Sequence, residues 1–300
     1  MAEIEVYFGD NLPILEAMPD ACVSLVYIDP PFNTGKTQER TQISTVRDEN
    51  GDRTGFQGKR YRTVKIGTKG YEDIFDDYLS FLEPRLLQAR RILNHTGSIF
   101  FHIDYREAHY CKILLDQVFG RDSFMNEIIW AYDYGARSKK KWSTKHDTIF
   151  WYAKNSEDYV FNFDEMDRIP YMAPGLVGKE KAARGKTPTD VWWHTIVSPN
   201  GKEKTGYPTQ KPRGVIDRII RVHTRAGDTV CDFFAGSGTL GESAAAHGRR
   251  SILIDSNAEA LHVMENRFRA FDVAWHNWTP LETQQELIVI HENYTELNNE

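Results

Sequence analysis

The hydrophobic and polar positions along the chain predict strands and helices that follow one another in alternation. Residues 23–28 form a continuous apolar run, which is typical of a parallel strand buried on both faces. Residues 75–93 place large apolar side chains three and four positions apart, which predicts an amphipathic helix that Pro84 kinks or splits. By the same criteria the other predicted strands are 3–8, 98–103, 126–132, 148–152, 229–233 and 250–254, and the other predicted helices are 11–18, 106–119, 212–227, 239–247 and 256–271.

Strands and helices in this order predict an α/β protein with a doubly wound, mostly parallel sheet. Ser256 and Glu259 have the spacing of a capping box, which sets the start of the last helix. Two segments lack any period. Residues 33–70 are polar, glycine-rich and basic and predict a long loop, and residues 155–208 predict an insertion or a small second domain.

The composition is that of a globular protein, since 40% of the 300 residues are hydrophobic and 27% are charged. No apolar run approaches the roughly 18 residues that a membrane-spanning helix needs, and the N-terminus lacks a secretory signal pattern. Cys22, Cys111 and Cys231 are far apart and no CxxC or HExxH motif is present, so neither a disulfide framework nor a metal site is indicated. We therefore expect a reduced, cytoplasmic protein without a membrane segment.

The net charge of −6 argues against a nucleic-acid partner, but the distribution of charge argues for one. Residues 1–35 and 270–300 contain acidic side chains and neither lysine nor arginine. The basic residues gather in the middle of the chain, in 53–69, 137–145 and 179–213. Any one of these clusters is equally well explained as a solvated loop, whereas three clusters between acidic ends favour a surface that binds a polyanion.

A glycine-rich motif follows the strand predicted at 229–233. Gly236-Ser-Gly-Thr-Leu-Gly241 fits the pattern GxGxxG, and Asp255 ends the next predicted strand. Glycines let the backbone approach a ligand closely, the helix N-terminus offers free N–H groups, and an acid at this place can bind ribose hydroxyls. The motif predicts a nucleoside cofactor without choosing among NAD, FAD and S-adenosylmethionine, and a tight structural turn is the alternative.

A second motif, Asp29-Pro-Pro-Phe32, follows the buried strand 23–28. The carboxyl end of such a strand faces the ligand crevice of an open α/β sheet. Two prolines prevent strand pairing, so the Pro30 carbonyl is free to accept a hydrogen bond beside the Asp29 carboxylate and the flat face of Phe32. These groups suit a flipped base that carries an exocyclic amine. The alternative is a Pro-Pro turn with Phe32 in the core.

The two motifs together resemble the catalytic and cofactor motifs of bacterial DNA amino-methyltransferases, with Phe234-Ala-Gly-Ser-Gly-Thr239 as the cofactor motif. The catalytic motif comes first in the chain, which resembles the β group, whose motif order is circularly permuted. Three further segments are similar to this family: Gly9-Asp10, His146-Asp-Thr-Ile-Phe-Trp-Tyr-Ala-Lys154 and Tyr207-Pro-Thr-Gln-Lys-Pro212. The resemblance covers about residues 4–270 and is weakest in 36–70 and 155–206.

The resemblance implies a Rossmann-like methyltransferase fold with an inserted target-recognition region. Residues 1–154 would form the catalytic part of the domain, 155–206 the target-recognition insertion, and 207–274 the cofactor-binding part of the same domain. Residues 275–300 would be an acidic C-terminal extension.

The resemblance also implies roles for single residues. Asp29 and the Pro30 carbonyl would hold the target amine, and Phe32, placed by Pro31, would stack on the base. The residues expected to bind S-adenosylmethionine are Asp10, Thr209, Gln210, Lys211, Asp232, Phe234, Ala235, Gly236, Ser237, Gly238, Thr239, Asp255 and Asn257. Those expected to contact DNA are Lys59, Arg60, Arg62, Arg137, Lys139, Lys140 and Lys141.

The resulting hypothesis is a restriction–modification methyltransferase that moves a methyl group from S-adenosylmethionine to a flipped base in double-stranded DNA, with adenine N6 favoured over cytosine N4. No Pro-Cys nucleophile is present, which excludes a typical cytosine-C5 enzyme. An NAD-dependent dehydrogenase, a non-catalytic DNA-binding subunit and an RNA substrate are the alternatives. The family also raises a homodimer and a cognate restriction endonuclease as partners, and a cytoplasmic location that is nucleoid-associated on DNA.

Overall fold

The structure, a computed structural model, describes residues 3–32, 36–47, 53–54, 60–73, 77–135, 137–198 and 200–281, and between 33 and 76 it describes the backbone alone. The chain divides into a large unit, formed by residues 1–32 with 77–300, and a small unit formed by residues 33–76. Among the described residues, no helix is both long and apolar enough to cross a membrane.

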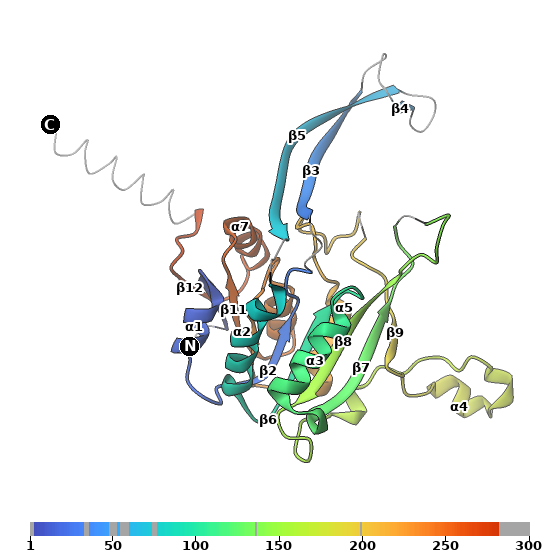
Figure 1. Cartoon of the computed structure of the whole chain (residues 1–300). Helices are drawn as coiled ribbons and strands as arrows, with labels where there is room; N and C mark the ends of the chain where they lie inside the picture. The colour runs from blue at the N-terminus through green and yellow to red at the C-terminus, as the bar shows by residue number, and fades with distance from the viewer. Residues whose placement is uncertain are drawn as a thin grey trace. The chain divides into compact units, whose positions relative to one another are not determined.

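The large unit is built on a sheet of nine described strands in the order β12-β1-β11-β10-β2-β6-β8-β7-β9 (Figure 1). Most neighbouring strands are parallel, and β8 is antiparallel to both of its neighbours, β6 and β7. This arrangement confirms the predicted doubly wound, mostly parallel sheet. The strands are β1 (Ile4–Phe8), β2 (Val23–Ile28), β6 (Leu93–Ile103), β7 (Phe124–Ala131), β8 (His146–Ala153), β9 (Val191–Trp193), β10 (Thr229–Asp232), β11 (Arg250–Asp255) and β12 (Val273–His276).

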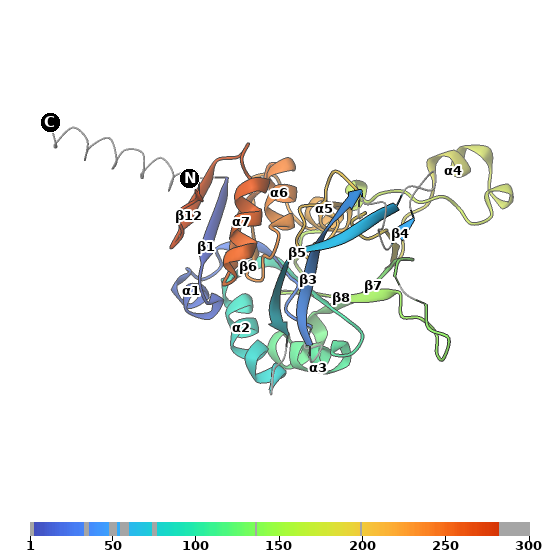
Figure 2. The ribbon, with the colours of Figure 1, turned by 90° about the horizontal axis from the view of Figure 1, so that it is seen from above.

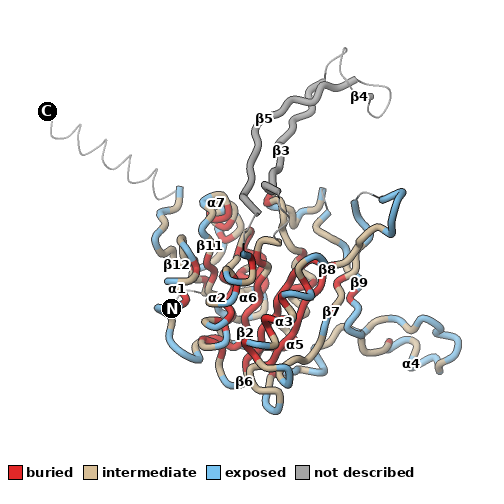
Figure 3. The backbone as a smooth tube through the Cα atoms, viewed as in Figure 1, coloured by how far each residue is buried: buried red, intermediate tan, exposed pale blue. Residues whose placement is uncertain are grey.

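Helices cover both faces of this sheet. Figure 2 shows α1, α2 and α3 on one face and α5, α6 and α7 on the other. The helices are α1 (Asn11–Ala17), α2 (Tyr78–Ile92), α3 (Ala108–Phe119), α4 (Lys179–Arg184), α5 (Arg213–His223), α6 (Thr239–Ala246) and α7 (Ala258–Arg267), with short 3₁₀ turns at Arg121–Ser123, Phe163–Glu165 and Pro174–Leu176. Because both faces are covered, the central strands are buried (Figure 3), and every residue of β2 is buried as its apolar run predicts.

Two helix predictions need correction. Pro84 does not split α2, which runs unbroken from Tyr78 to Ile92. Leu82 and Leu86 on either side of it are fully buried, so packing offsets the loss of one backbone hydrogen bond. The N-cap of α7 is Asn257, whose side chain accepts the Glu259 N–H, rather than Ser256, and the helix ends at Arg267 instead of continuing to 271.

The small unit contains an antiparallel hairpin, so the prediction of a long loop over 33–70 was wrong for most of that segment. Strand β3 (Lys36–Arg47) pairs with β5 (Arg60–Asp73), and the short β4 (Arg53–Thr54) also pairs with β5. The high charge of this segment hid a strand signal, because 41–46 and 63–66 are rich in Thr, Val and Ile, which favour strands.

The segment 155–206 is attached to the main sheet rather than folded apart from it. Its strand β9 extends the sheet by pairing in parallel with β7. Asp167 accepts hydrogen bonds from Arg221 at 2.7 Å and Arg218 at 3.4 Å, both on α5. These contacts place the segment within the large unit.

Candidate active site

The topology brings the two sequence motifs together at one edge of the sheet. Strands β10 and β2 are parallel neighbours, with Val230 opposite Leu25 and Cys231 opposite Val26. The glycine motif follows β10 and the tetrapeptide Asp29–Phe32 follows β2. Both motifs therefore lie side by side at the carboxyl ends of these two parallel strands. The helix after β10 covers one face and the helix after β2 the other (Figure 2), which is the arrangement that opens a ligand crevice in α/β sheets.

Asp29 is a mostly buried carboxylate whose two oxygens differ in their contacts with the described residues. Its Oδ2 forms an ion pair with Lys211 Nζ, and the two side chains are only 15% and 11% exposed. Its Oδ1 is buried and has no hydrogen-bond partner among the described residues. The Lys211 ammonium also lies 4.8 Å from the centre of the Phe32 ring. A cation therefore occupies the space between the carboxylate and the aromatic face.

The backbone of this tetrapeptide is held by α2. The Tyr78 hydroxyl donates a hydrogen bond of 2.6 Å to the Pro31 carbonyl. No described residue donates to the neighbouring Pro30 carbonyl. The sequence missed Tyr78, because nothing in the amphipathic pattern of α2 distinguishes a tyrosine that packs from one that also donates to a loop. Together Asp29 and Pro30 offer two acceptors beside the ring of Phe32.

A buried hydrogen-bond network lies behind Phe32, whose ring centre is 6.1 Å from that of His102. His102 bonds to the Tyr27 hydroxyl at 2.8 Å through Nδ1 and to Asp147 at 3.3 Å through Nε2. Burial raises the pKa of Asp147, but interactions with His102, Lys211 and Tyr132 outweigh it and hold the pKa below its ordinary value. Sequence reasoning missed Tyr27 and His102, which look like ordinary strand positions, although Asp147 lies in the family-like segment 146–154.

The glycine motif makes a tight turn into α6. Gly236 and Gly238 have φ angles of +51° and +73°, which other residues rarely adopt. A Cβ at Gly238 would lie 2.6 Å from Cζ of Phe268. The Gly236 N–H donates to Asp255 Oδ2 at 2.7 Å, and the Asn257 N–H donates to the other oxygen of Asp255 at 2.8 Å. Asp255 thereby fixes the turn as well as standing at the end of β11.

Two further carboxyls make this edge of the sheet acidic. Burial raises the pKa of Asp232 well above its ordinary value, although its hydrogen bond from the Phe234 N–H acts the other way, and the charges of Asp29 and Asp255 raise it further. Burial likewise raises the pKa of Asp255, against three backbone hydrogen bonds. Both carboxyls therefore hold their protons to higher pH than usual, and a nearby positive charge would favour their ionised forms.

The remaining predicted cofactor residues lie around the same edge, although two of them make other contacts. The Thr239 hydroxyl donates to the Lys211 carbonyl at 3.2 Å, which joins the 207–212 segment to the glycine motif. The side chain of Lys211, expected at the cofactor, instead pairs with Asp29. Gln210 is engaged within its own loop, accepting from the Thr205 N–H at 2.8 Å and donating to the Glu203 carbonyl at 2.7 Å.

Asp10 lies beside the glycine motif but acts first as a structural group. Its Oδ1 caps α1 by accepting the Leu12 N–H at 3.1 Å and pairs with Arg85 at 2.9 Å. Asn11, next to it, donates at 2.6 Å to the Phe233 carbonyl just before the motif. The Asp10 side chain is 61% exposed, so it retains a face toward solvent.

The predicted DNA-contacting residues divide between the two units. Lys59 and the side chains of Arg60 and Arg62 lie outside the described part of the structure. The other four, Arg137, Lys139, Lys140 and Lys141, are exposed in the loop between β7 and β8. Since Thr148 of β8 pairs with Ile103, the last residue of β6, this loop leaves the sheet at the same edge as Asp29.

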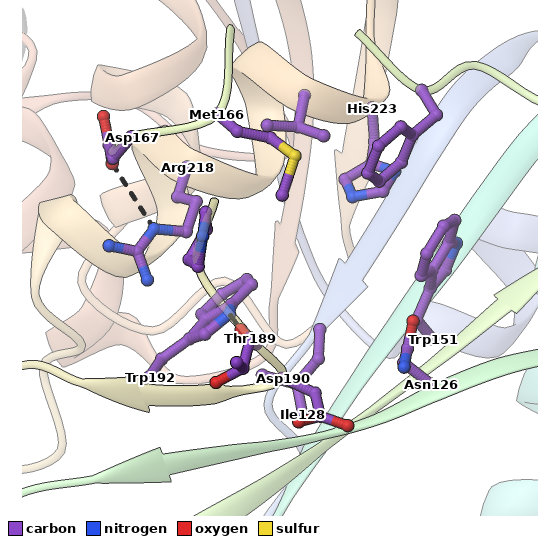
Figure 4. A pocket seen from close by; sticks show the side chains of 13 residues that line it. Asn126, Ile128, Trp151, Met166, Asp167, Thr189, Asp190, Trp192, Arg218 and His223 are labelled. Atoms are coloured by element: carbon purple, nitrogen blue, oxygen red, sulfur yellow. Dashed lines mark hydrogen bonds and ion pairs between the residues drawn. The ribbon is translucent and has the colours of Figure 1, made fainter. Parts of the chain in front are cut away.

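A cavity of about 380 Å³ lies elsewhere, between β7, β8, α5 and the segment 155–206 (Figure 4). Trp151 and Trp192 form part of its wall, and the Arg218 guanidinium lies 4.8 Å from the Trp192 ring centre. Figure 4 shows Arg218 also paired with Asp167 on this wall. The cavity shares no residue with the edge that carries Asp29 and Gly236, so it is a feature of how the 155–206 segment packs.

Comparison with known proteins agrees with this geometry. The DNA methylase family model for N6 and N4 amino-methylation matches residues 23–266. The chain is 28% identical over 268 residues to the type II methyltransferase M.HpaI of Haemophilus parainfluenzae, covering 88% of this chain and 75% of that protein. It is 27% identical over 284 residues to the DNA adenine methyltransferase YhdJ of Escherichia coli K12, covering 90% and 83%.

Solved structures show the same fold. The cytosine-N4-specific PvuII DNA methyltransferase superposes with a TM-score of 0.62 at 17% identity, covering 95% of this chain and 91% of that one. The M1.HpyAVI–SAM complex gives a TM-score of 0.57 at 20% identity, covering 88% and 98%. The expected Rossmann-like methyltransferase fold is thus confirmed. Because the family model spans most of the chain, including both motifs that meet at the sheet edge, this protein belongs to the N6/N4 DNA methylase family.

Proposed function

We propose that this protein transfers a methyl group from S-adenosylmethionine to the exocyclic amine of a flipped base in double-stranded DNA, with adenine N6 as the acceptor. The observation that carries the proposal is the buried Asp29 carboxylate, whose Oδ1 has no partner among the described residues. It stands beside the Pro30 carbonyl and the Phe32 ring, next to the strand that leads into the glycine motif.

The residues after β10 and β11 fit S-adenosylmethionine. The positive φ angles of Gly236 and Gly238 leave backbone exposed where a side chain would stand. Asp255, at the end of β11, would accept ribose hydroxyls beside its backbone hydrogen bonds, and a cationic ligand would favour the ionised form of Asp232, whose pKa burial raises. The cofactor, when bound, supplies a methyl group activated by a sulfonium. Phe234, Ala235, Ser237 and Thr239 would line its site, and Thr209, Gln210 and Asn257 would border it.

Asp29 and Pro30 would activate the base. An exocyclic amine is a weak nucleophile because its lone pair is delocalised into the ring. Hydrogen bonds from its two N–H groups to the Asp29 carboxylate and the Pro30 carbonyl favour the pyramidal amine and stabilise the positive charge that develops on nitrogen. Asp29 then stands ready to receive the proton that the methylated nitrogen releases.

The contact between Lys211 and Asp29 supports this role of the Asp29 carboxylate as an acceptor for a donor group. Its ammonium is a cation with N–H donors, and it lies on Asp29 and near the face of Phe32, where the base would stack. The incoming amine would replace the ammonium on Asp29. Phe32 would hold the ring by stacking, and the fixed turn of Pro30 and Pro31 would align the nitrogen for direct transfer.

Adenine N6 is the proposed acceptor because Asp, rather than Ser, stands at the first position of the tetrapeptide. YhdJ, similar along 90% of this chain, is an adenine methyltransferase by name, which supports the same choice. Cytosine N4 is the second candidate, since the PvuII enzyme shares the fold and the same two acceptors can hold either amine.

Genome sequencing with modification detection, in cells that express the protein, would locate the methylated sequence. Nucleoside mass spectrometry of that DNA should then show N6-methyladenine. N4-methylcytosine without N6-methyladenine would overturn the choice of base. Absence of both, together with thermal stabilisation by NAD and not by S-adenosylmethionine, would overturn the proposal in favour of a dehydrogenase.

A further inference from the structure

The loop between β7 and β8 combines positive charge with an exposed aromatic ring. Residues 132–145 contain one acidic residue, Asp133, and five basic ones: Arg137, Lys139, Lys140, Lys141 and Lys145. Trp142, at the tip, is 97% exposed, although a tryptophan side chain is one of the largest apolar groups a protein can bury. No described residue buries its side chain, and the loop around it is coloured as exposed in Figure 3.

Hydrogen bonds within the loop give its tip a defined shape. The Ser138 hydroxyl accepts the backbone N–H groups of Lys140 and Lys141, at 3.1 and 3.2 Å. The Ser138 N–H in turn donates to the Ser143 hydroxyl at 2.8 Å. Both serines thus tie the two sides of the tip together, and Trp142 is presented from a folded turn beside three lysines.

The loop stands within reach of DNA that occupies the catalytic edge. Its base lies at the same end of the sheet as Asp29. In the order β2-β6-β8-β7, His146 of β8 is two strands from β2 and Ala131 of β7 is three strands from it. Three strand spacings amount to about 14 Å. Along a duplex this corresponds to about four base-pair steps of 3.4 Å. Figure 1 shows the loop projecting beyond the ends of β7 and β8.

We propose that Trp142 inserts into the base stack of duplex DNA within about four base pairs of the target and stabilises the opened duplex, while the flanking basic side chains hold the phosphates. The inference rests on the proposed function. Apolar side chains that enter a base step unstack it and bend the duplex, and an aromatic ring on a base replaces part of the lost stacking. Trp142 is therefore a positioning residue, which lowers the cost of removing the target base from the helix.

The test compares W142A and W142F with the unchanged protein in single-turnover methylation. Each acts on two short duplexes that carry the methylated sequence found by genome sequencing, one fully paired and one with an abasic site opposite the target base. On the paired duplex W142A should be slower by roughly five- to hundredfold, the range expected for loss of one aromatic–base stack. On the abasic duplex the target base has no pairing partner, so removing it from the helix costs less free energy. W142A should therefore approach the rate of the unchanged protein on this duplex. W142F keeps a ring and should fall between.

Two control variants separate this role from others. Y110A removes a 60% exposed aromatic ring on α3 and should leave both rates unchanged. K139A/K140A/K141A should weaken binding of both duplexes alike and flatten the salt dependence of affinity, without rescue by the abasic site. Equal rates for W142A and the unchanged protein on the paired duplex, or an equal loss on both duplexes, would overturn the inference. If the unchanged protein methylates neither duplex, the proposed function itself fails.

Discussion

Replacing Asp29 with Asn should slow methyl transfer strongly and at the same time destabilise the fold, and the two effects can be separated. Asn keeps the size of the side chain and one oxygen acceptor but removes the negative charge. The charge is what stabilises a positive nitrogen, so we expect the single-turnover rate to fall about 10²–10³-fold. Affinity for S-adenosylmethionine should change little, because the proposed cofactor loop follows β10 and not β2.

The destabilisation follows from the ion pair. D29N leaves the Lys211 ammonium, 11% exposed, without its counter-charge. Removing one partner of a buried pair costs about 3–5 kcal/mol, whereas removing both charges together is close to neutral. D29N and K211M should therefore each lower the free energy of unfolding by about 3 kcal/mol. The double variant D29N/K211M should recover most of that loss.

The assay combines urea unfolding with single-turnover methylation on the same four proteins. The double variant is the decisive one, because it should be folded and yet as inactive as D29N. K211M keeps the carboxylate and should be at least tenfold faster than D29N. A D29N rate within about tenfold of the unchanged protein would refute the role of Asp29. A double variant no more stable than either single one would refute the interpretation of the pair.

Three other predictions concern stability. Burial raises the pKa of Asp232 well above 3.8, so the folded state retains this proton at higher pH, and stability falls as pH rises from 3.8 to the raised value. D232N should remove that fall, as urea unfolding at a series of pH values above 3.8 would show. Burial lowers the pKa of His223 from 6.5 to about 3, so the stability it contributes is present above pH 6.5 and is lost as pH falls toward 3. H223F should flatten this acid loss, and an unchanged slope would contradict the assignment. G238A should cost roughly 1–2 kcal/mol for its φ of +73° and a further amount for the steric clash of the new Cβ with Phe268. G248A, with a φ of +69° and open space around it, should carry only the backbone cost. Equal losses of unfolding free energy in the two variants would exclude the clash.

Much of the fold was predictable because buried strands and helix faces require apolar residues at regular positions in the sequence. The run of β2 and the glycine turn after β10 each predicted both an element and its place at the sheet edge. The hairpin of the small unit was missed because its alternation is masked by charge and because each residue pairs with a partner 14 to 37 positions away along the chain. Asn257 was missed as a cap because Ser256 and Asn257 are both good capping residues, and only the backbone decides between them.

The candidate site was predictable in its motifs and not in its contacts. Asp29 and Gly238 carry distinctive neighbours in the sequence, so their roles could be proposed from type and spacing. The pairing of Lys211 with Asp29 joins residues 182 positions apart, and no local pattern encodes it. Tyr78 and His102 were missed for the same reason, since each acts on a loop or strand that only the tertiary fold brings near.

The pairing of β2 with β10 also determines when the sheet can be completed during synthesis of the chain. The tetrapeptide Asp29–Phe32, proposed to be catalytic, is synthesised early, whereas strand β10 beside it follows about 200 residues later. At 5–20 residues per second, the ribosome needs roughly 10–40 s to close that interval. During this time the apolar β2 has an unpaired edge, which is the kind of surface that chaperones bind and that aggregates form on.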